Sequence, residues 1–261
     1  MDLELAARRV LVVGASQGLG KAIAATFVAE GAVVAAAARS RGKIEVWRGT
    51  LTEREASLVS IHDLDLADMA SVDRLADALL ARGGIDILVN NCGGPAPGGV
   101  VGTATETWTK AFASMAASVF HLTDRLIKPM IERKWGRIIT IGSSGVEQPI
   151  PNLAVSNAIR GSVAGWSKSL ANEVAEHGIT VNMVLPGRIA TERLESLDQN
   201  RAGKQNLAIE EVRRQSQAEI PAKRYGTPEE FAAVVAFLAS APASYVTGSM
   251  IRVDGGATKG L

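Results

Sequence analysis

The sequence of 261 residues contains one cysteine, Cys92, and three histidines. A single cysteine excludes an internal disulfide framework and a cysteine-rich metal site. The histidines do not pair with acids at metal-ligand spacing, so we expect no metal. No apolar run reaches the roughly 18–20 residues that a membrane span needs, and the N-terminal residues lack the basic and apolar regions of a signal peptide. These absences predict a cytoplasmic location and no membrane partner.

The chain also lacks an excess of charge of one sign. Lysine and arginine total 28 and aspartate and glutamate total 27, which gives a net charge of +1. Both signs are spread along the chain, so no electrostatic feature indicates a nucleic acid or a membrane surface as a partner. The length suits one large α/β domain or two small ones.

What the sequence does contain is a glycine-rich turn in Val10–Gly20, which reads VLVVGASQGLG. A short β-branched apolar run ends at Gly14, glycines recur at Gly18 and Gly20, and an alanine-rich helical segment follows. Gly14 permits the turn, Gly18 lets the backbone approach a pyrophosphate, and Gly20 lets helix and strand pack closely. The free N–H groups and positive dipole at the helix start suit phosphates. This pattern predicts a dinucleotide site.

The second predicted strand, Ala32–Ala38, ends in a cluster of cations. Arg39, Ser40 and Arg41 follow it directly, with Lys43 two residues later. A fold that prefers NAD places an acid near this strand end to accept the ribose 2′-hydroxyl, and no acid stands there. The cations indicate a 2′-phosphate instead, hence NADP(H) as cofactor. A solvated basic loop is the alternative interpretation.

Strand-like and helix-like segments alternate about six times along the chain. This alternation predicts an α/β fold, a doubly wound parallel sheet (Rossmann fold) forming a single domain over residues 1–261. We expect further strands at Leu58–Leu64, Ile85–Val89, Arg137–Ile141, Ile179–Leu185 and Met250–Val253, and helices at Ser71–Arg82, Thr105–Arg133, Leu153–His177 and Pro228–Ala239. Pro129 is expected to bend or end the second of these helices.

Ligands of such folds bind beyond the carboxyl ends of the strands. Five loops are predicted to meet there: Gly14–Gly20, Arg39–Lys43, Asn90–Gly94, Gly142–Gly145 and Pro186–Thr191. The long polar insertion at about 192–224 is either a substrate lid or a surface helix pair with solvated charge.

Several of these segments together resemble the short-chain dehydrogenase/reductase family, and the 3-oxoacyl-acyl-carrier-protein reductases most. The matching elements span nearly the whole chain: Gly14-xxx-Gly18-x-Gly20, Asn90-Asn91-x-Gly93, Gly136–Ser143, Lys168–Ala171, Ile179–Asn182, Pro186-Gly187-x-Ile189-x-Thr191 and Val253–Gly256. The resemblance implies cofactor contacts at Ser16, Gln17, Leu19, Arg39, Ser40, Asp65, Leu66 and Asn91, and implies that Ile189 and Thr191 hold the nicotinamide carboxamide. It also implies a homotetramer formed through Thr105–Arg133 and Leu153–His177.

The predicted active site departs from this family's pattern. The family uses Tyr-xxx-Lys after a catalytic serine, with an asparagine from the earlier long helix. In this chain Ser156 stands at the tyrosine position, Arg160 at the lysine position and Met115 at the asparagine position, and Ser143 alone matches. A serine hydroxyl is a far weaker acid than a phenol, and Met115 offers only a thioether. Arg160 retains the charge and donors to hold the nicotinamide ribose, but it does not release a proton at working pH.

Few side chains are available as a substitute proton donor. Glu147 lies just past Ser143 and is either a buried acid or, as we favour, a solvated surface residue. Tyr225 and Tyr245 are expected to be packing residues, and Cys92 an inert thiol. For Arg188, steering of an acidic substrate group and a salt bridge are equally favoured.

Three functions follow from these residues. The first is an NADP(H)-dependent oxidoreductase acting on a carbonyl or alcohol substrate, in which Ser143 polarises the carbonyl, Arg160 holds ribose or an oxyanion, and water or Glu147 delivers the proton. The second is a catalytically silent dinucleotide-binding sensor, scaffold or subunit partner. The third, hydride addition to an activated C=C or C=N bond, ranks lowest because no residue points to it.

Overall fold

The computed structural model, which describes residues 1–260, is built on one parallel sheet. Its strands lie in the order β3-β2-β1-β4-β5-β6-β7, and every described pair is parallel. The strands are β1 (Arg9–Val13), β2 (Val33–Ala38), β3 (Val59–Asp63), β4 (Ile87–Asn90), β5 (Gly136–Ile141), β6 (Ile179–Pro186) and β7 (Met250–Val253). The predicted doubly wound sheet is therefore confirmed, and all carboxyl ends meet at one edge.

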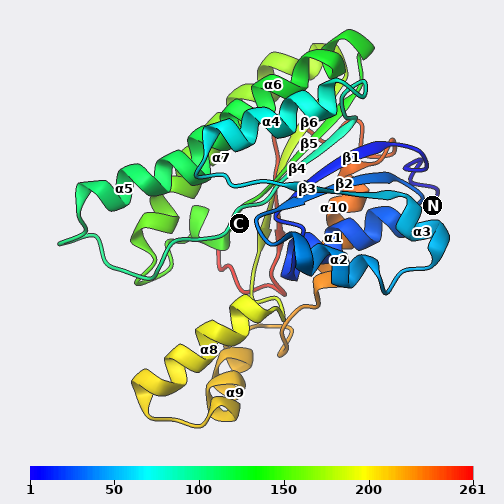
Figure 1. Ribbon diagram of the computed structural model, residues 1–261. Helices are drawn as coiled ribbons and strands as arrows, with labels where there is room; N and C mark the ends of the chain where they lie inside the picture. The colour runs from blue at the N-terminus through cyan, green and yellow to red at the C-terminus, as the bar shows by residue number, and fades with distance from the viewer. Residues whose placement is uncertain (261) are drawn as a thin grey trace.

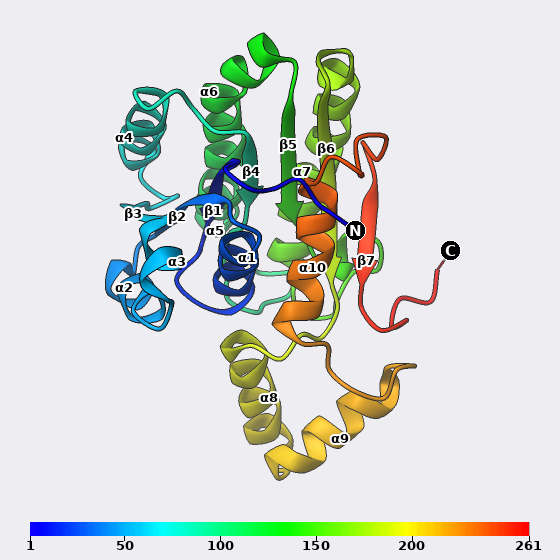
Figure 2. The ribbon, with the colours of Figure 1, turned by 90° about the vertical axis from the view of Figure 1, so that its right-hand side faces the viewer.

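Helices cover both faces of the sheet (Figures 1 and 2). One face carries α1 (Gly18–Ala29), α2 (Arg41–Arg48) and α10 (Pro228–Ala239), which share a hydrophobic cluster with the sheet. The opposite face carries α4 (Met69–Leu80), α6 (Ser118–Arg133) and α7 (Ala154–Val174), which form a second cluster. The central strands are buried on both sides, which explains why they read as unbroken apolar runs.

Two short helices were not expected from the sequence. The stretch after β2, predicted as a loop, forms α2, and α3 (Glu53–Ser57) follows it. Ile44 and Trp47 are the buried residues of α2, and Trp47 Nε1 donates to Ala15 O at 3.0 Å. The helix thus forms by docking on the glycine turn, a tertiary contact that the sequence pattern did not reveal.

The predicted helix Thr105–Arg133 is one continuous helical stretch with three parts. It consists of α5 (Thr105–Phe112), a π-helical turn (Ala113–Ala117) and α6. The helix continues through Pro129 to Arg133, and Lys134 ends it in the left-handed conformation. Pro129 therefore does not end the helix.

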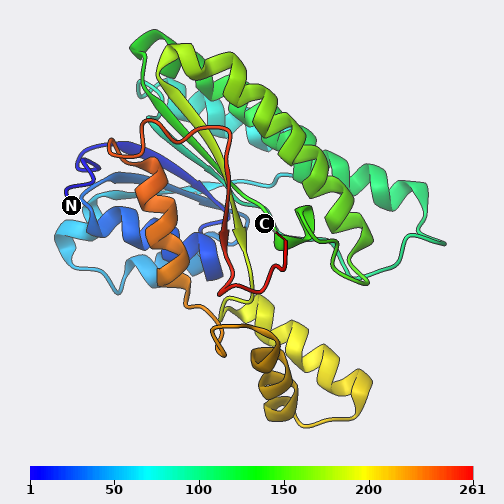
Figure 3. The same cartoon turned by 180° about the vertical axis from the view of Figure 1, so that it is seen from behind.

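Beyond the carboxyl edge of the sheet two further helices project from the main body. They are α8 (Glu192–Gln205) and α9 (Ile209–Glu219), drawn in yellow and light orange in Figure 3. Thr191 is the N-cap of α8, because its Oγ1 accepts from Leu194 N at 3.4 Å. The polar insertion is thus a helix pair attached directly after β6, beside the loops that meet at this edge.

Candidate functional site

The glycine turn after β1 has the close backbone packing that the sequence predicts. Gly14 and Gly18 adopt φ values of +70° and +55°, which favour glycine. A Cβ atom on Gly20 would lie 2.1 Å from Gly14 O, so a larger residue cannot occupy that position. Asn91 Nδ2 approaches the same Gly14 O at 3.5 Å. This cradle leaves the N-terminus of α1 open to an anionic ligand, since Gln17 gives it no side-chain cap.

At the end of β2 the cations differ in what they contact. Arg41 pairs with Glu45 (3.0 Å) and Asp63 (3.8 Å), and Lys43 Nζ donates to Gln17. Arg39 is exposed and has no ion-pair partner among residues 1–260. Ser40 is the N-cap of α2 without a side-chain capping bond. The guanidinium of Arg39 and the hydroxyl of Ser40 are thus both available to a ligand at this strand end.

The other residues expected to contact the cofactor lie on loops at the same edge. Asp65 and Leu66 follow β3, and the Asp65 carboxylate accepts from Ala67 N at 3.0 Å. Ser16 and Leu19 lie within the glycine turn, half-buried. Ile189 is buried after β6, and Thr191 Oγ1 also donates to Ile189 O at 3.3 Å.

Ser143 begins a short 3-10 turn after β5. Its Oγ accepts from Gly145 N at 3.1 Å, which leaves the hydroxyl proton free to be donated. Ser156 lies in the first turn of α7 with only 9% of its surface exposed. Its Oγ would be 4.0 Å from a Cβ on Gly94, so it faces the loop after β4. Among the described residues no hydrogen bond joins the two serines.

The guanidinium of Arg160 points at the ends of two neighbouring strands. Nη1 donates to Ile141 O at 2.9 Å and Nη2 donates to Cys92 O at 3.1 Å. Arg160 therefore connects the loop that follows β4 with the last residue of β5. Both Nη atoms thus bind main-chain oxygens, and the contact of Arg160 with the nicotinamide ribose stays a prediction.

Arg160 lines a cavity of about 10 Å³. The other lining residues include Asn90, Thr140 and Met115. Asn90 Oδ1 and Thr140 Oγ1 are buried there without a hydrogen-bond partner within the described chain. These residues pair across β4 and β5, so their polar atoms face the same space. A cavity of this size with two unpaired polar atoms suits one water molecule.

Of the side chains considered as substitute acids, Glu147 and Tyr225 are already engaged. Glu147 is largely buried and ion-paired with Arg252 on β7, so the expected solvated surface glutamate is wrong. Tyr225 donates to Asp198 at 2.9 Å, and burial raises the pKa of this phenol above its usual 10. Tyr245 is fully exposed, so the expectation that it is a packing residue is wrong.

Arg188 forms the salt bridge that was one of its two predicted roles, with Asp198 at 3.4 Å. Asp198 is a buried residue of α8 that sequence reasoning missed, because a lone acid in a polar helix gives no signal of burial. It accepts bonds from Arg188 and Tyr225, and so attaches α8 to the segments at both ends of the helix pair.

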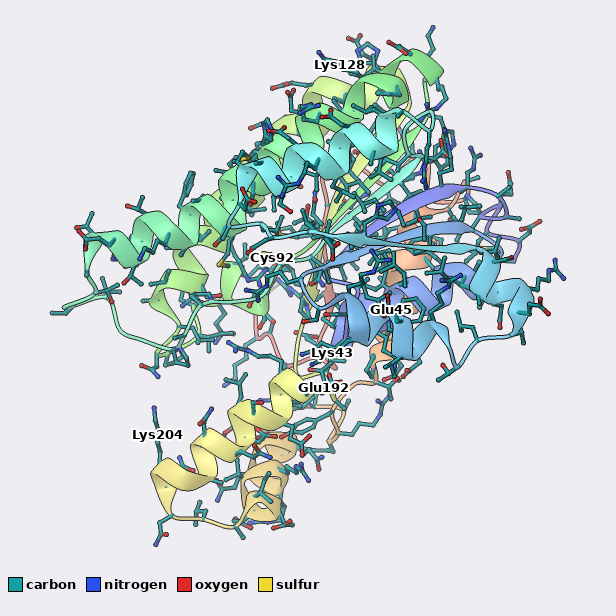
Figure 4. The ribbon with its side chains drawn as sticks, in the orientation of Figure 1. Lys43, Glu45, Cys92, Lys128, Glu192 and Lys204 are labelled. Atoms are coloured by element: carbon teal, nitrogen blue, oxygen red, sulfur yellow. The ribbon has the colours of Figure 1, made fainter. Side chains whose placement is uncertain are left out.

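The labelled side chains in Figure 4 show how these parts lie. Lys43 and Glu192 lie at the carboxyl edge of the sheet, and Cys92 lies between the sheet and α5. Glu192 Oε2 would be 3.6 Å from a Cβ on Gly18.

No group of histidine, cysteine and acidic side chains suited to a metal occurs in residues 1–260. No helix in that range has the length and apolar character of a membrane span.

Comparison with known proteins gives consistent matches over nearly the whole chain. A family model described as enoyl-(acyl carrier protein) reductase matches residues 14–258. The 3-oxoacyl-(acyl-carrier-protein) reductase FabG of Salmonella typhimurium is 38% identical over 250 residues, covering 94% of this chain and 95% of the relative. Nodulation protein G of a Rhizobium species is 38% identical over 254 residues, covering 97% and 98%.

Solved structures agree with these matches. L-sorbose reductase from Gluconobacter frateurii, complexed with NADPH and L-sorbose, aligns with a TM-score of 0.94 at 30% identity over 100% of both chains. YwfH, an NADPH-dependent reductase involved in bacilysin biosynthesis, aligns with a TM-score of 0.91 at 31% identity, covering 97% of this chain and 99% of that one.

Proposed function

Because this chain belongs to the short-chain dehydrogenase/reductase family and is similar to 3-oxoacyl-acyl-carrier-protein reductases, we propose that it is an NADP(H)-dependent oxidoreductase acting on a carbonyl or alcohol substrate. The solved neighbours that bind or depend on NADPH support this choice of cofactor. The observation that carries it is the free Arg39 guanidinium beside the free Ser40 hydroxyl, at a strand end without an acid.

The residues present fit a phosphorylated dinucleotide. The cradle of Gly14, Gly18 and Gly20 would hold the pyrophosphate at the start of α1, since larger side chains are excluded there. Arg39, Ser40 and Lys43 would hold the 2′-phosphate. Asp65, Leu66 and Asn91 would line the adenosine and ribose portions, and Ile189 and Thr191 the carboxamide. When bound, the cofactor supplies or accepts the hydride at the substrate carbon.

The chain's own residues would orient and polarise the substrate. Ser143 would donate its hydroxyl proton in a hydrogen bond to the carbonyl oxygen. Arg160 would fix the loop after β4 to the end of β5 and place positive charge near the developing oxyanion. With no phenol at Ser156 and Glu147 paired to Arg252, a water molecule would deliver the proton. The helix pair α8–α9 would act as the substrate lid.

Calorimetric titration with NADPH and NADH tests the cofactor. We expect NADPH to bind at least about tenfold more tightly, since charge-assisted hydrogen bonds contribute roughly 1.5–3 kcal/mol each. Arg39→Ala should remove most of this preference. Arg41→Ala is the matched control, because Arg41 is already ion-paired. Equal affinity for the two nucleotides would refute the assignment of NADP.

A catalytically silent dinucleotide-binding protein is the second candidate. The surroundings of Ser156 and Arg160 favour it. Ser156 is buried, and both Nη atoms of Arg160 are bound to main-chain oxygens. Turnover assays on ketones, quinones and 3-oxoacyl thioesters separate the two functions. We would conclude that the protein is catalytically silent if it binds NADPH without turnover. The same result is then expected in the triple variant Ser156→Tyr, Arg160→Lys and Met115→Asn.

We also propose a homotetramer formed through α5–α6 and α7. Phe120 of α6 stacks on Trp166 of α7 with ring centroids 4.5 Å apart, and Phe112 of α5 is exposed beside them. This aromatic group supports a subunit contact on that face. Sedimentation at equilibrium measures the oligomeric state directly.

A further inference from the structure

One arginine at the mouth of the candidate site has no role in the proposed chemistry. Arg193 lies in the first turn of α8 and reaches back to the loop after β4, where Nη2 contacts Pro95 O at 3.4 Å. A Cβ on Gly94 would lie 3.6 Å from Arg193 Nη2 and 4.0 Å from Ser156 Oγ. The guanidinium and the Ser156 hydroxyl therefore both lie close to the Cβ position of the same glycine.

Three other arginines near this edge are engaged with carboxylates, and Arg193 is not. Arg188 pairs with Asp198, Arg213 with Glu195 and Arg252 with Glu147. Within residues 1–260, Arg193 has the Pro95 carbonyl as a partner but no carboxylate in ion-pair range. Its neighbour Glu192 lies over Gly18 instead. The charge of Arg193 is therefore available to a ligand.

The position of Arg193 is unfavourable for its own helix. The first turn of a helix favours acids, because the N–H groups there carry partial positive charge. Glu192 and Glu195 follow this rule in the same turn, and Arg193 breaks it. Departures from local rules of this kind are expected at functional sites.

The space beside Arg193 is open to a small molecule. No atom lies within 4 Å of a Cβ built on Gly93, and both Gly93 and Gly94 are exposed. A ligand chain running from Ser156 past this pair of glycines would end at the guanidinium. A planar guanidinium binds carboxylate or phosphate oxygens in pairs.

We propose that Arg193 is a specificity-determining residue that binds an anionic end group of the substrate, so that the substrates are carbonyl compounds or alcohols carrying a carboxylate or phosphate at the far end of a short chain. This inference rests on the proposed function, since it assigns the substrate class of the same site. The binding of the cofactor does not depend on it.

Calorimetric titrations into the NADP⁺-saturated protein test the proposal without requiring turnover. The probes are levulinate and its longer straight-chain homologues, their neutral methyl esters, and the matching oxo-phosphonates. We expect at least one anion to bind about tenfold or more tightly than its ester, and Arg193→Gln to reduce this ratio to below about threefold. Arg193→Lys should keep part of the ratio. The stronger of the two anion series identifies the group as carboxylate or phosphate.

Arg213→Gln is the matched control, since it removes an arginine of the helix pair that is already ion-paired. Three outcomes would overturn the role of Arg193. The Kd values of each acid and its ester could lie within threefold of each other, the ratio of these Kd values could persist in Arg193→Gln, or no probe could bind. Failure of the wild-type protein to bind NADP⁺ or NADPH would instead overturn the proposed function, and titration of the same probes into the unsaturated protein still reports on Arg193.

Discussion

The carboxylate of Glu192 lies over Gly18, with Oε2 3.6 Å from the position of a Cβ on that glycine. Gly18 is the first residue of α1, and its N-cap Gln17 contributes no side-chain cap. The first residue of the helix pair thus places a negative charge at the helix end that we propose as the pyrophosphate site. A carboxylate and a pyrophosphate compete for the same N–H groups.

Replacing Glu192 with glutamine should therefore tighten NADPH binding. A charge at a helix terminus contributes about 0.3–1 kcal/mol, which corresponds to roughly a two- to fivefold lower Kd. Glu219→Gln makes the same charge change at the far end of α9 and should leave Kd unaltered. Calorimetry measures both, and weaker binding by Glu192→Gln would show that its carboxylate assists the ligand.

Ser143→Ala should lower kcat/KM by about 100-fold while the Kd for NADPH stays within twofold. The hydroxyl accepts from Gly145 N, so its proton is free for the substrate oxygen, and loss of one such donor has this order of effect. Steady-state kinetics and titration of the same preparation give the two numbers. Ser144→Ala is the neighbouring control, and equal losses in both variants would remove Ser143 from the mechanism.

Arg160→Met should lower the free energy of unfolding by about 1–3 kcal/mol. The substitution removes two hydrogen bonds and leaves the Ile141 and Cys92 carbonyls without these donors. Arg160→Lys should lose less, because one ammonium can still reach a carbonyl. Urea unfolding measures the difference. Unchanged stability in the methionine variant would mean that the guanidinium does not hold the loop after β4 to the end of β5.

The phenol of Tyr225 should make stability depend on pH in the alkaline range. Burial, the largest cause, raises its pKa above 10 in the folded protein, and the bond to Asp198 raises it further. A raised pKa stabilises the fold fully below the unfolded value near 10 and loses that contribution as pH rises through the folded value. Tyr225→Phe should therefore flatten the fall in unfolding free energy above about pH 10. Tyr245→Phe, at an exposed position, should retain the wild-type slope.

The fold was predictable because its signals are local. Unbroken apolar runs such as Ile87–Asn90 and Ile179–Leu185 lie on parallel strands buried on both faces, and the glycines of the first turn have the backbone angles and close contacts that their spacing predicts. The helix α2 was missed because it has only eight residues, half of them charged, and it is stabilised by docking Trp47 on Ala15. Such short helices depend on tertiary contacts.

The sequence by itself determined the doubly wound sheet, the edge at which its loops meet and the identities of Ser143, Ser156, Arg160 and Met115. These follow from the periodicity of apolar residues, the spacing of motifs and the residue types, which are properties of positions close together in the sequence. Only the tertiary structure decided which charged side chains form ion pairs. Glu147 and Arg188 find partners that lie far along the chain or on another element, whereas Arg39 and Arg193 find no carboxylate in the described residues. Ion pairing is a matter of distances of a few ångströms between side chains, and those distances exist only once the chain has folded.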